Sequence, residues 1–226
     1  TYPFRSKEFT FIHPPQKSDY VNITRITRDT YTGISGMVMN SHGELIFAHR
    51  VDHVLYKILP MTNRPVIYAG VNKVAGFIDG YRLNARFESP RAITIDKDDN
   101  IWICDRQNGL IRKLSVAGFV LTIAGKGKET FRSNIIDSGL GTYVTISDPF
   151  DIGIDDYTGD VYFSDYSGRT VRRIQSYIYV STVAGHYDRT IQGEFGVTNG
   201  YGTFSSFISP AGIAVFSPTR TVYISD

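Results

Sequence analysis

The sequence predicts an all-β protein built from a repeated four-stranded unit. Within residues 87–125, four short runs rich in Ile, Val and Leu are separated by tight turns, one of which is Asn108-Gly109. The same arrangement recurs along the 226-residue chain at a nearly constant spacing. Alternating runs of this length, divided by turn residues, are typical of antiparallel strands.

Residues 1–35 fit the repeat poorly and are expected to form an N-terminal arm or an outer strand of another unit. In the clearest unit we expect strands at 92–96, 101–105, 110–114 and 119–124. The units themselves are predicted at 36–70, 90–125, 149–185 and, in part, 210–226. The first unit departs from the others because His49 stands where they have Asp.

Three kinds of landmark residue keep the period. An Asp ends the second strand and recurs after 60 and then 61 residues, and a Pro before the first strand recurs after 59 and 61. A Gly closes each complete unit. The landmarks are Asp105, Asp165 and Asp226, then Pro90, Pro149 and Pro210, and finally Gly70, Gly125 and Gly185. We interpret them as structural, with each Asp accepting hydrogen bonds from backbone N–H groups of the following turn.

These landmarks resemble the NHL repeat. In the second unit the resemblance rests on FIDG (77–80), ARFESP (85–90), AITID (92–96), IWICD (101–105), LIRKL (110–114) and TIAG (122–125). It covers roughly residues 36–226 and implies a β-propeller of four-stranded blades, about three and a half of which are present. The long segments between units resemble the long-insert type of this family. We therefore expect the chain to be part of a larger propeller.

The net charge, the hydrophobic runs and the cysteine content make several classes of function unfavourable for this chain. The formal net charge is +2, so no strong field draws the whole molecule toward nucleic acid. No apolar run is long enough for a membrane span. The single cysteine, Cys104, lies in the apolar run IWICD, which predicts a buried, inert thiol.

Enzymatic chemistry is the first alternative, because propellers resembling this one include metal-dependent lyases and lactonases. A zinc centre needs about three converging imidazoles, and the histidines are His13, His42, His49, His53 and His186. We interpret these as turn or surface residues. Calcium could bind the carboxylates at Asp96, Asp98 and Asp99 or at Asp155 and Asp156, but both groups occur where turns are expected. We therefore predict no catalytic, cofactor-binding or metal-binding residue.

RNA binding is the second alternative. Basic residues recur on the third strand of each unit, at Lys57, Arg112-Lys113 and Arg172-Arg173. Because neighbouring strand residues face opposite ways, one pair cannot form a continuous patch. We interpret these residues as a solvated blade face.

The preferred hypothesis is a non-enzymatic protein-interaction or assembly module without a cofactor. Its partners would be other proteins or further blades of the same protein. The long loops 71–89, 126–148 and 186–209 are expected to provide contact surfaces. Tyrosines that suit such contacts are Tyr143, Tyr157, Tyr166, Tyr177, Tyr179, Tyr187 and Tyr201. Asn22 is a possible glycosylation site, which favours an extracellular location over a cytoplasmic one.

Overall fold

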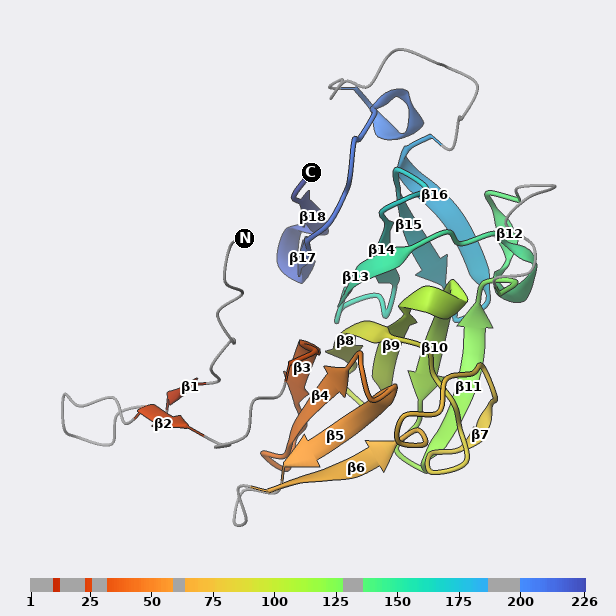
Figure 1. Cartoon of the computed structure of the whole chain (residues 1–226). Helices are drawn as coiled ribbons and strands as arrows, with labels where there is room; N and C mark the ends of the chain where they lie inside the picture. Colours follow the sequence, from red (N-terminus) through yellow and green to blue (C-terminus); the bar gives the residue numbers. More distant parts are fainter. Residues whose placement is uncertain (1–9, 13–22, 26–31, 59–63, 128–135, 187–199) are drawn as a thin grey trace, which may run out of the picture.

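The structure confirms the all-β prediction. The computed structural model describes residues 10–12, 23–25, 32–58, 64–127, 136–186 and 200–226, in which four successive antiparallel sheets form blades 1 to 4 (Figure 1). Blade 1 comprises β3 (Ile34–Met39), β4 (Leu45–His49), β5 (Val54–Ile58) and β6 (Pro65–Ala69). Blade 2 comprises β8 (Pro90–Ile95), β9 (Ile101–Asp105), β10 (Leu110–Leu114) and β11 (Phe119–Ala124). Blade 3 comprises β13 (Pro149–Ile154), β14 (Val161–Asp165), β15 (Thr170–Gln175) and β16 (Tyr179–Gly185), and blade 4 comprises β17 (Ile213–Phe216) and β18 (Thr221–Ile224).

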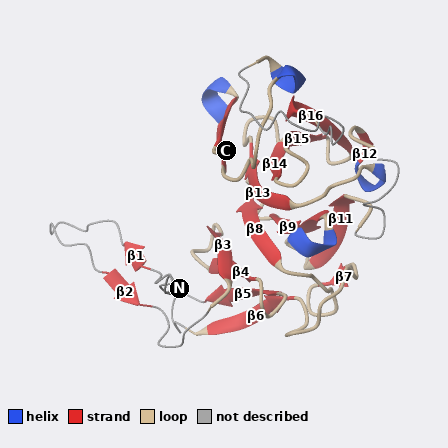
Figure 2. Ribbon diagram, turned by 45° about the horizontal axis from the view of Figure 1, so that its top comes forward, coloured by secondary structure: helices blue, strands red, loops and turns tan. Residues whose placement is uncertain are grey.

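The blades follow one another round an arc, with the first strand of each blade on the inside (Figure 2). Strand β3 lies beside β8, β8 beside β13, and β13 beside β17. Within each blade the strands pair in sequence order, so the later strands extend outward. This is the blade arrangement of a β-propeller.

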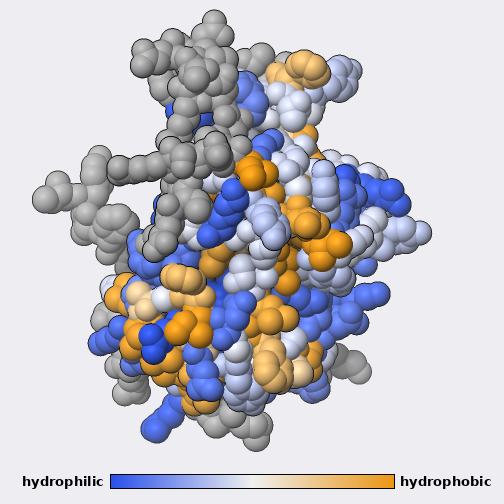
Figure 3. Space-filling model, turned by 90° about the vertical axis from the view of Figure 1, so that its right-hand side faces the viewer, coloured by the Kyte–Doolittle hydropathy of each residue, from blue (hydrophilic) through white to orange (hydrophobic). Residues whose placement is uncertain are grey.

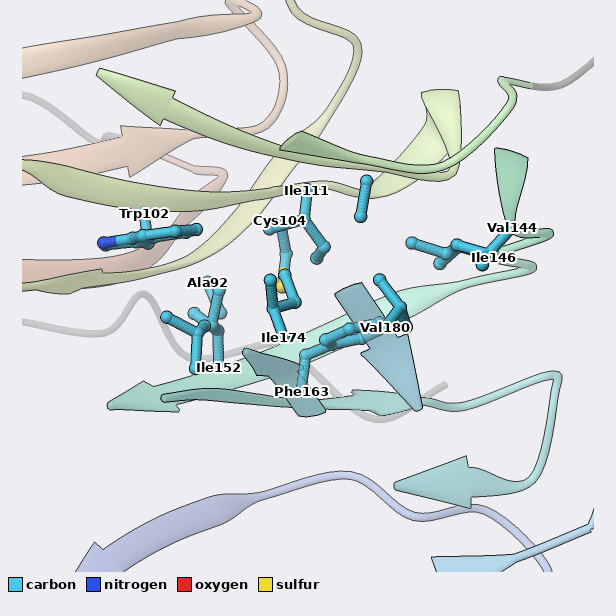
Figure 4. Packing of buried hydrophobic residues seen from close by; sticks show 12 residues of the cluster. Ala92, Trp102, Cys104, Ile111, Val144, Ile146, Ile152, Phe163, Ile174 and Val180 are labelled. Carbon is cyan, nitrogen blue, oxygen red and sulfur yellow. The ribbon is translucent and has the colours of Figure 1, made fainter. Parts of the chain in front are cut away.

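The hydrophobic core lies between the faces of neighbouring blades. Every residue of the second strands β4, β9 and β14 is buried, which accounts for their continuous apolar runs. Between blades 2 and 3, Trp102, Cys104 and Ile111 of blade 2 pack against Phe163 and Ile174 of blade 3 (Figure 4). Cys104 is a free, buried thiol, as predicted, and burial raises its pKa well above the usual value.

The glycines that close the blades allow a close backbone approach. Gly70, Gly125 and Gly185 have φ angles of +95°, +103° and +77°. A Cβ atom at any of them would collide with a backbone carbonyl oxygen in the turn between the second and third strands of its own blade. For Gly125 that oxygen belongs to Gly109. Glycine is therefore required by both conformation and space.

Two of the expected loops contain short strands. Strand β7 (Gly80–Tyr81) pairs with β11, and β12 (Gly139–Leu140) pairs with β16, so each adds a fifth strand to the outer edge of a blade. Ala85 and Phe87 of loop 71–89 are wholly buried in the core. The expectation that this loop is a free contact surface is therefore wrong for Ala85 and Phe87, whereas much of the rest of the loop is exposed.

The N-terminal segment contains a separate two-stranded ribbon. Strands β1 (Thr10–Ile12) and β2 (Ile23–Arg25) pair with each other. Strand β3 begins at Ile34, two residues before the predicted start of the first unit. Asn22, His13 and residues 187–199 of the third loop lie outside the described residues. None of the described helices has the length and apolar character needed to cross a membrane.

Candidate functional site

The landmark aspartates fasten the segment that leads into each blade. Asp165 accepts hydrogen bonds from the backbone N–H groups of Ser147 and Asp148, at 2.9 and 2.8 Å, just before the first strand of blade 3. The turn after β14 donates one further backbone bond to this carboxylate at 3.1 Å. Asp105 and Asp226 accept backbone N–H bonds from the corresponding segments of blades 2 and 4. Each Asp thus holds the chain before its blade. The backbone bond from the following turn that the sequence predicted is present at Asp165, whereas Asp105 accepts the Asn108 side-chain amide instead.

The third strands carry a buried arginine whose role the sequence did not reveal. Arg112 has no solvent-exposed surface. It donates hydrogen bonds to Asp105 (2.9 Å), Asp79 (2.6 Å), the Ile78 carbonyl (3.0 Å) and the Arg86 carbonyl (3.1 Å). Arg172 is equally buried in blade 3 and donates to the carbonyl oxygens of Thr145 and Asp137. The interpretation of these two arginines as a solvated face is wrong, because each is enclosed beneath the loop that precedes its blade.

The remaining basic residue of each third strand forms an ion pair with a carboxylate at the end of the blade that lies away from the landmark Asp position. The nitrogen–oxygen separations are 2.9 Å for Lys57–Glu44, 3.5 Å for Lys113–Asp96 and 3.7 Å for Arg173–Asp160. Each carboxylate belongs to the turn between the first and second strands. Adjacent basic residues thus point in opposite directions, and neither set forms a continuous phosphate-binding surface.

Blade 1 replaces the buried Asp–Arg pair with a different cluster. His49 and Tyr56 occupy the positions of Asp105 and Arg112, and their rings are in edge contact at 5.7 Å. The Tyr56 hydroxyl donates to Asp52 at 2.9 Å, and the Asp52 backbone N–H donates to His49 Nδ1 at 3.1 Å. His49 is thus buried rather than a surface residue as interpreted from sequence.

The remaining described histidines do not converge with His49. His53 Nδ1 accepts the Ser89 backbone N–H at 3.0 Å, whereas His42 and His186 are exposed in turns or loops. Throughout the part of the chain that the structure describes, no group of three or more His, Cys, Asp or Glu side chains is arranged to hold a metal ion.

The carboxylates considered for calcium belong to turns. Asp96 accepts hydrogen bonds from the backbone N–H groups of Asp98 and Asn100 and from Trp102 Nε1. Although burial favours the neutral form, hydrogen bonds from Asn100 and Trp102 lower the pKa of Asp96. A shallow hollow of about 120 Å³ lies beside it, between the turns of blades 2 and 3. The Asp96 oxygens are thus already used as acceptors within blade 2.

An unusual group of side chains lies at the other end of the inner strands. It consists of Arg50, Arg91, Arg106, Phe150 and Tyr166, which we call the arginine–aromatic cluster. Arg91 and Phe150 are the second residues of β8 and β13, whereas Arg50, Arg106 and Tyr166 directly follow β4, β9 and β14. Antiparallel pairing of the first and second strands brings all five positions to the same end of the blades.

Stacking gives the cluster a defined geometry. The Arg91 guanidinium lies over the Phe150 ring, 3.3 Å from its centroid, and the Arg106 guanidinium lies 5.2 Å from the same centroid. Phe150 stacks in turn on Tyr166, with ring centroids 4.9 Å apart. Arg106 makes a two-point ion pair with Asp148 at 2.5 and 2.9 Å, and this bonding raises the pKa of Arg106.

Arg91 and Arg50 differ from Arg106 in having no carboxylate partner among the described residues. Among the described residues, neither guanidinium makes a hydrogen bond or an ion pair, although both side chains are partly buried. Burial lowers the pKa of Arg91, and the positive charges of Arg106 and Arg50 lower it further, against the opposing charges of Asp148 and Asp151. Within the described part of the chain, the cluster thus contains positive charge without a paired carboxylate.

Sequence reasoning missed this cluster except for Tyr166. The available signal was positional, because the residues following each landmark Asp and Pro occupy equivalent places in successive blades. In blade 2 these residues are Arg106 and Arg91, and in blade 1 Arg50 follows His49. Their common end of the sheet could have been inferred from the hairpin register alone.

The outer side of blades 2 and 3 offers a second exposed surface. Figure 3 shows apolar groups mixed with hydrophilic ones on this side. The exposed apolar residues of loop 71–89 and of strand β11 include Phe77, Ile78, Leu83, Phe119 and Leu121. The predicted contact tyrosines that are exposed are Tyr143, Tyr157, Tyr177, Tyr179 and Tyr201, and Tyr187 lies outside the described residues.

Comparison with known proteins agrees with the propeller architecture. No family model matches the chain. Over 81 residues it is 30% identical to Protein SUPPRESSOR OF QUENCHING 1, chloroplastic, of Arabidopsis thaliana, which corresponds to 36% of this chain and 8% of that protein.

Solved structures match over most of the chain. One is an auxiliary nutrient binding protein from Bacteroides thetaiotaomicron, with a TM-score of 0.66 and 15% identity over 90% of this chain and 47% of that one. Another is virginiamycin B lyase from Staphylococcus aureus, with a TM-score of 0.54 and 13% identity over 88% of this chain and 50% of that one. The chain thus spans about half the length of these structures. It belongs to the β-propeller class, whose members here include a binding protein and an enzyme.

Proposed function

We propose that the chain is a non-enzymatic binding module of the NHL type, in which rigid blades present the arginine–aromatic cluster to a protein partner. The observation that carries this proposal is Arg91, a partly buried guanidinium that lies 3.3 Å from the Phe150 ring centroid and has no carboxylate partner among the described residues. Removing such a group from water without pairing it is unfavourable. A ligand that supplies the missing partner recovers that free energy on binding, which favours a recognition role.

The enzyme alternative rests on the likeness to a lyase, and the RNA alternative rests on the basic third-strand residues. The first requires a metal or nucleophile in the described blades or elsewhere in the protein. The second is weakened because Lys57, Lys113 and Arg173 are each paired within their own blade. An extracellular location and glycosylation at Asn22 remain part of the proposal.

The test compares three forms of the protein. The wild type, a double variant Arg50→Ser/Arg91→Ser and the control Lys97→Ser are immobilised and exposed to protein from the cells or medium in which the chain is made. Lys97 is exposed at the opposite end of blade 2. We expect one protein to be retained by the wild type and the control and lost by the double variant, and its purified form to reproduce this order of affinity in calorimetry.

Two results would contradict the proposal. One is equal retention of every captured protein by all three forms at equal melting temperature. The other is a stoichiometric bound metal in the purified protein, together with turnover of a small-molecule substrate that depends on it.

A further inference from the structure

We propose that Arg91, flanked by Arg50 and Arg106, binds a carboxylate from an acidic segment of the partner protein. This inference rests on the proposed function and deepens it by naming the chemistry of the ligand. The argument uses the orientation of Arg91, the charge around it and the behaviour of its neighbour Arg106.

The orientation of Arg91 leaves its donor edge open. The Phe150 ring covers one face of the guanidinium at 3.3 Å, which immobilises the group and removes part of its hydration. Its N–H groups lie in the guanidinium plane and have no acceptor in the described residues. A planar, fixed fork of donors matches the two oxygens of a carboxylate.

Arg106 shows this recognition within the same cluster. Its Nε and one terminal nitrogen bind the two Asp148 oxygens at 2.5 and 2.9 Å while its guanidinium lies 5.2 Å from the Phe150 ring centroid. Arg91 contacts the same ring more closely but has no such partner. In this cluster, therefore, Arg106 already binds a carboxylate, whereas Arg91 binds none among the described residues.

The charge balance favours a carboxylate over a phosphate polyanion. The charged groups that act on Arg91 are Arg50, Arg106, Asp148 and Asp151. Together with Arg91 they comprise three cations and two carboxylates, which leaves one net positive charge. One carboxylate is enough to neutralise that charge, so the site does not need the row of phosphates that an RNA backbone supplies.

The aromatic members make an acidic protein segment the fitting source of the carboxylate. Phe150 and Tyr166 form a partly exposed stacked pair beside Arg91, with ring centroids 4.9 Å apart. Such a surface can accommodate the stem of a Glu side chain or a neighbouring apolar residue. A free inorganic anion would leave these rings unused.

The experiment measures binding of a fluorescein-labelled hexaglutamate peptide to the whole protein by fluorescence anisotropy. The variants are Arg91→Ala, Arg91→Lys and the control Lys97→Ala, with melting temperatures recorded for each. We expect Arg91→Ala to weaken binding about tenfold or more, Arg91→Lys to retain an intermediate affinity because it keeps the charge but loses the fork, and Lys97→Ala to bind as the wild type does. Hexaglutamine and oligouridine at the same concentration are expected to compete poorly.

Equal hexaglutamate binding by the wild type and Arg91→Ala would overturn the inference, as would oligouridine displacing the peptide at lower concentration than unlabelled hexaglutamate. A retained partner that requires Arg50 and Arg91 but is not displaced by hexaglutamate would refute the carboxylate assignment and leave the proposed function standing. A third outcome is that hexaglutamate binding depends on Arg91 but no captured protein depends on Arg50 and Arg91 for its retention. In that case the proposed function fails while the carboxylate site stands.

Discussion

Replacing Arg112 with Met should destabilise the protein strongly, because the guanidinium supports both a blade and the loop before it. The substitution keeps a long unbranched stem and removes four hydrogen bonds, two of them to carboxylates. Asp105 would then be fully buried without its cationic partner. Removing one member of a buried ion pair costs about 3–5 kcal/mol.

The loss should depend on pH in a defined direction. Burial raises the pKa of Asp105 to about 6, while the charge of Arg112 opposes this effect. Without Arg112 the folded-state pKa rises further above the unfolded value of about 3.9. A group with a raised folded-state pKa contributes stability at low pH and loses it as the pH rises. The destabilisation by Arg112→Met should therefore be larger at pH 8 than at pH 5.5.

Urea unfolding followed by the fluorescence of Trp102, the one tryptophan, measures these effects in the core between blades 2 and 3. The matched control is Lys113→Met, which removes a longer ion pair, 3.5 Å, with Asp96 from a lysine that is not fully buried, and it should cost clearly less than Arg112→Met. The double variant Asp105→Asn/Arg112→Met should recover part of the loss, because no buried charge remains. Equal small losses for Arg112→Met and Lys113→Met would refute the reasoning.

Two further substitutions test other parts of the structure. Hydrogen bonds outweigh burial and lower the pKa of Asp96, so its contribution to the free energy of unfolding is present above about pH 4 and is lost as the pH falls through the folded-state pKa. Asp96→Asn should therefore flatten the acid limb of a stability–pH curve, and an unchanged limb would contradict this reasoning. Gly125→Ala should cost more than about 2 kcal/mol of unfolding free energy, because φ is +103° and the new Cβ meets the Gly109 carbonyl. Its control is Gly127→Ala, also at positive φ but with no atom of the described residues within 4 Å of the new Cβ. Thermal melts in which the two variants lose equal stability would show that the contact does not matter.

The sequence predicted the strands of blade 2 closely because the relevant signals are local. The expected strands at 101–105, 110–114 and 119–124 coincide with β9, β10 and β11. Each is delimited by turn residues and by apolar runs that pack on both faces. The first strand starts earlier than expected, at Pro90, because Pro90 pairs with Asp105 across a register shift.

The roles of the basic residues could not be assigned in the same way. Arg112 and Lys113 are adjacent and chemically similar, yet one is wholly buried and the other reaches a carboxylate at the opposite end of the blade. Strand alternation predicts that they diverge but does not say which one is buried. That outcome depends on loop 71–89, whose Asp79 and carbonyl oxygens enclose Arg112.

The period, the strands and the landmark Asp, Pro and Gly positions are encoded in short stretches of sequence, since turn chemistry and side-chain alternation act over a few residues. The arginine–aromatic cluster is different, because its five members come from three blades and meet where the inner strands begin. Which of their charges are paired depends on how successive blades pack against one another. Arg106 binds Asp148 of the next blade, whereas the equally basic Arg91 stacks on Phe150 and is left without a carboxylate among the described residues. That difference arises from the three-dimensional arrangement of blades, since the one-dimensional pattern treats both simply as arginines that follow a landmark residue.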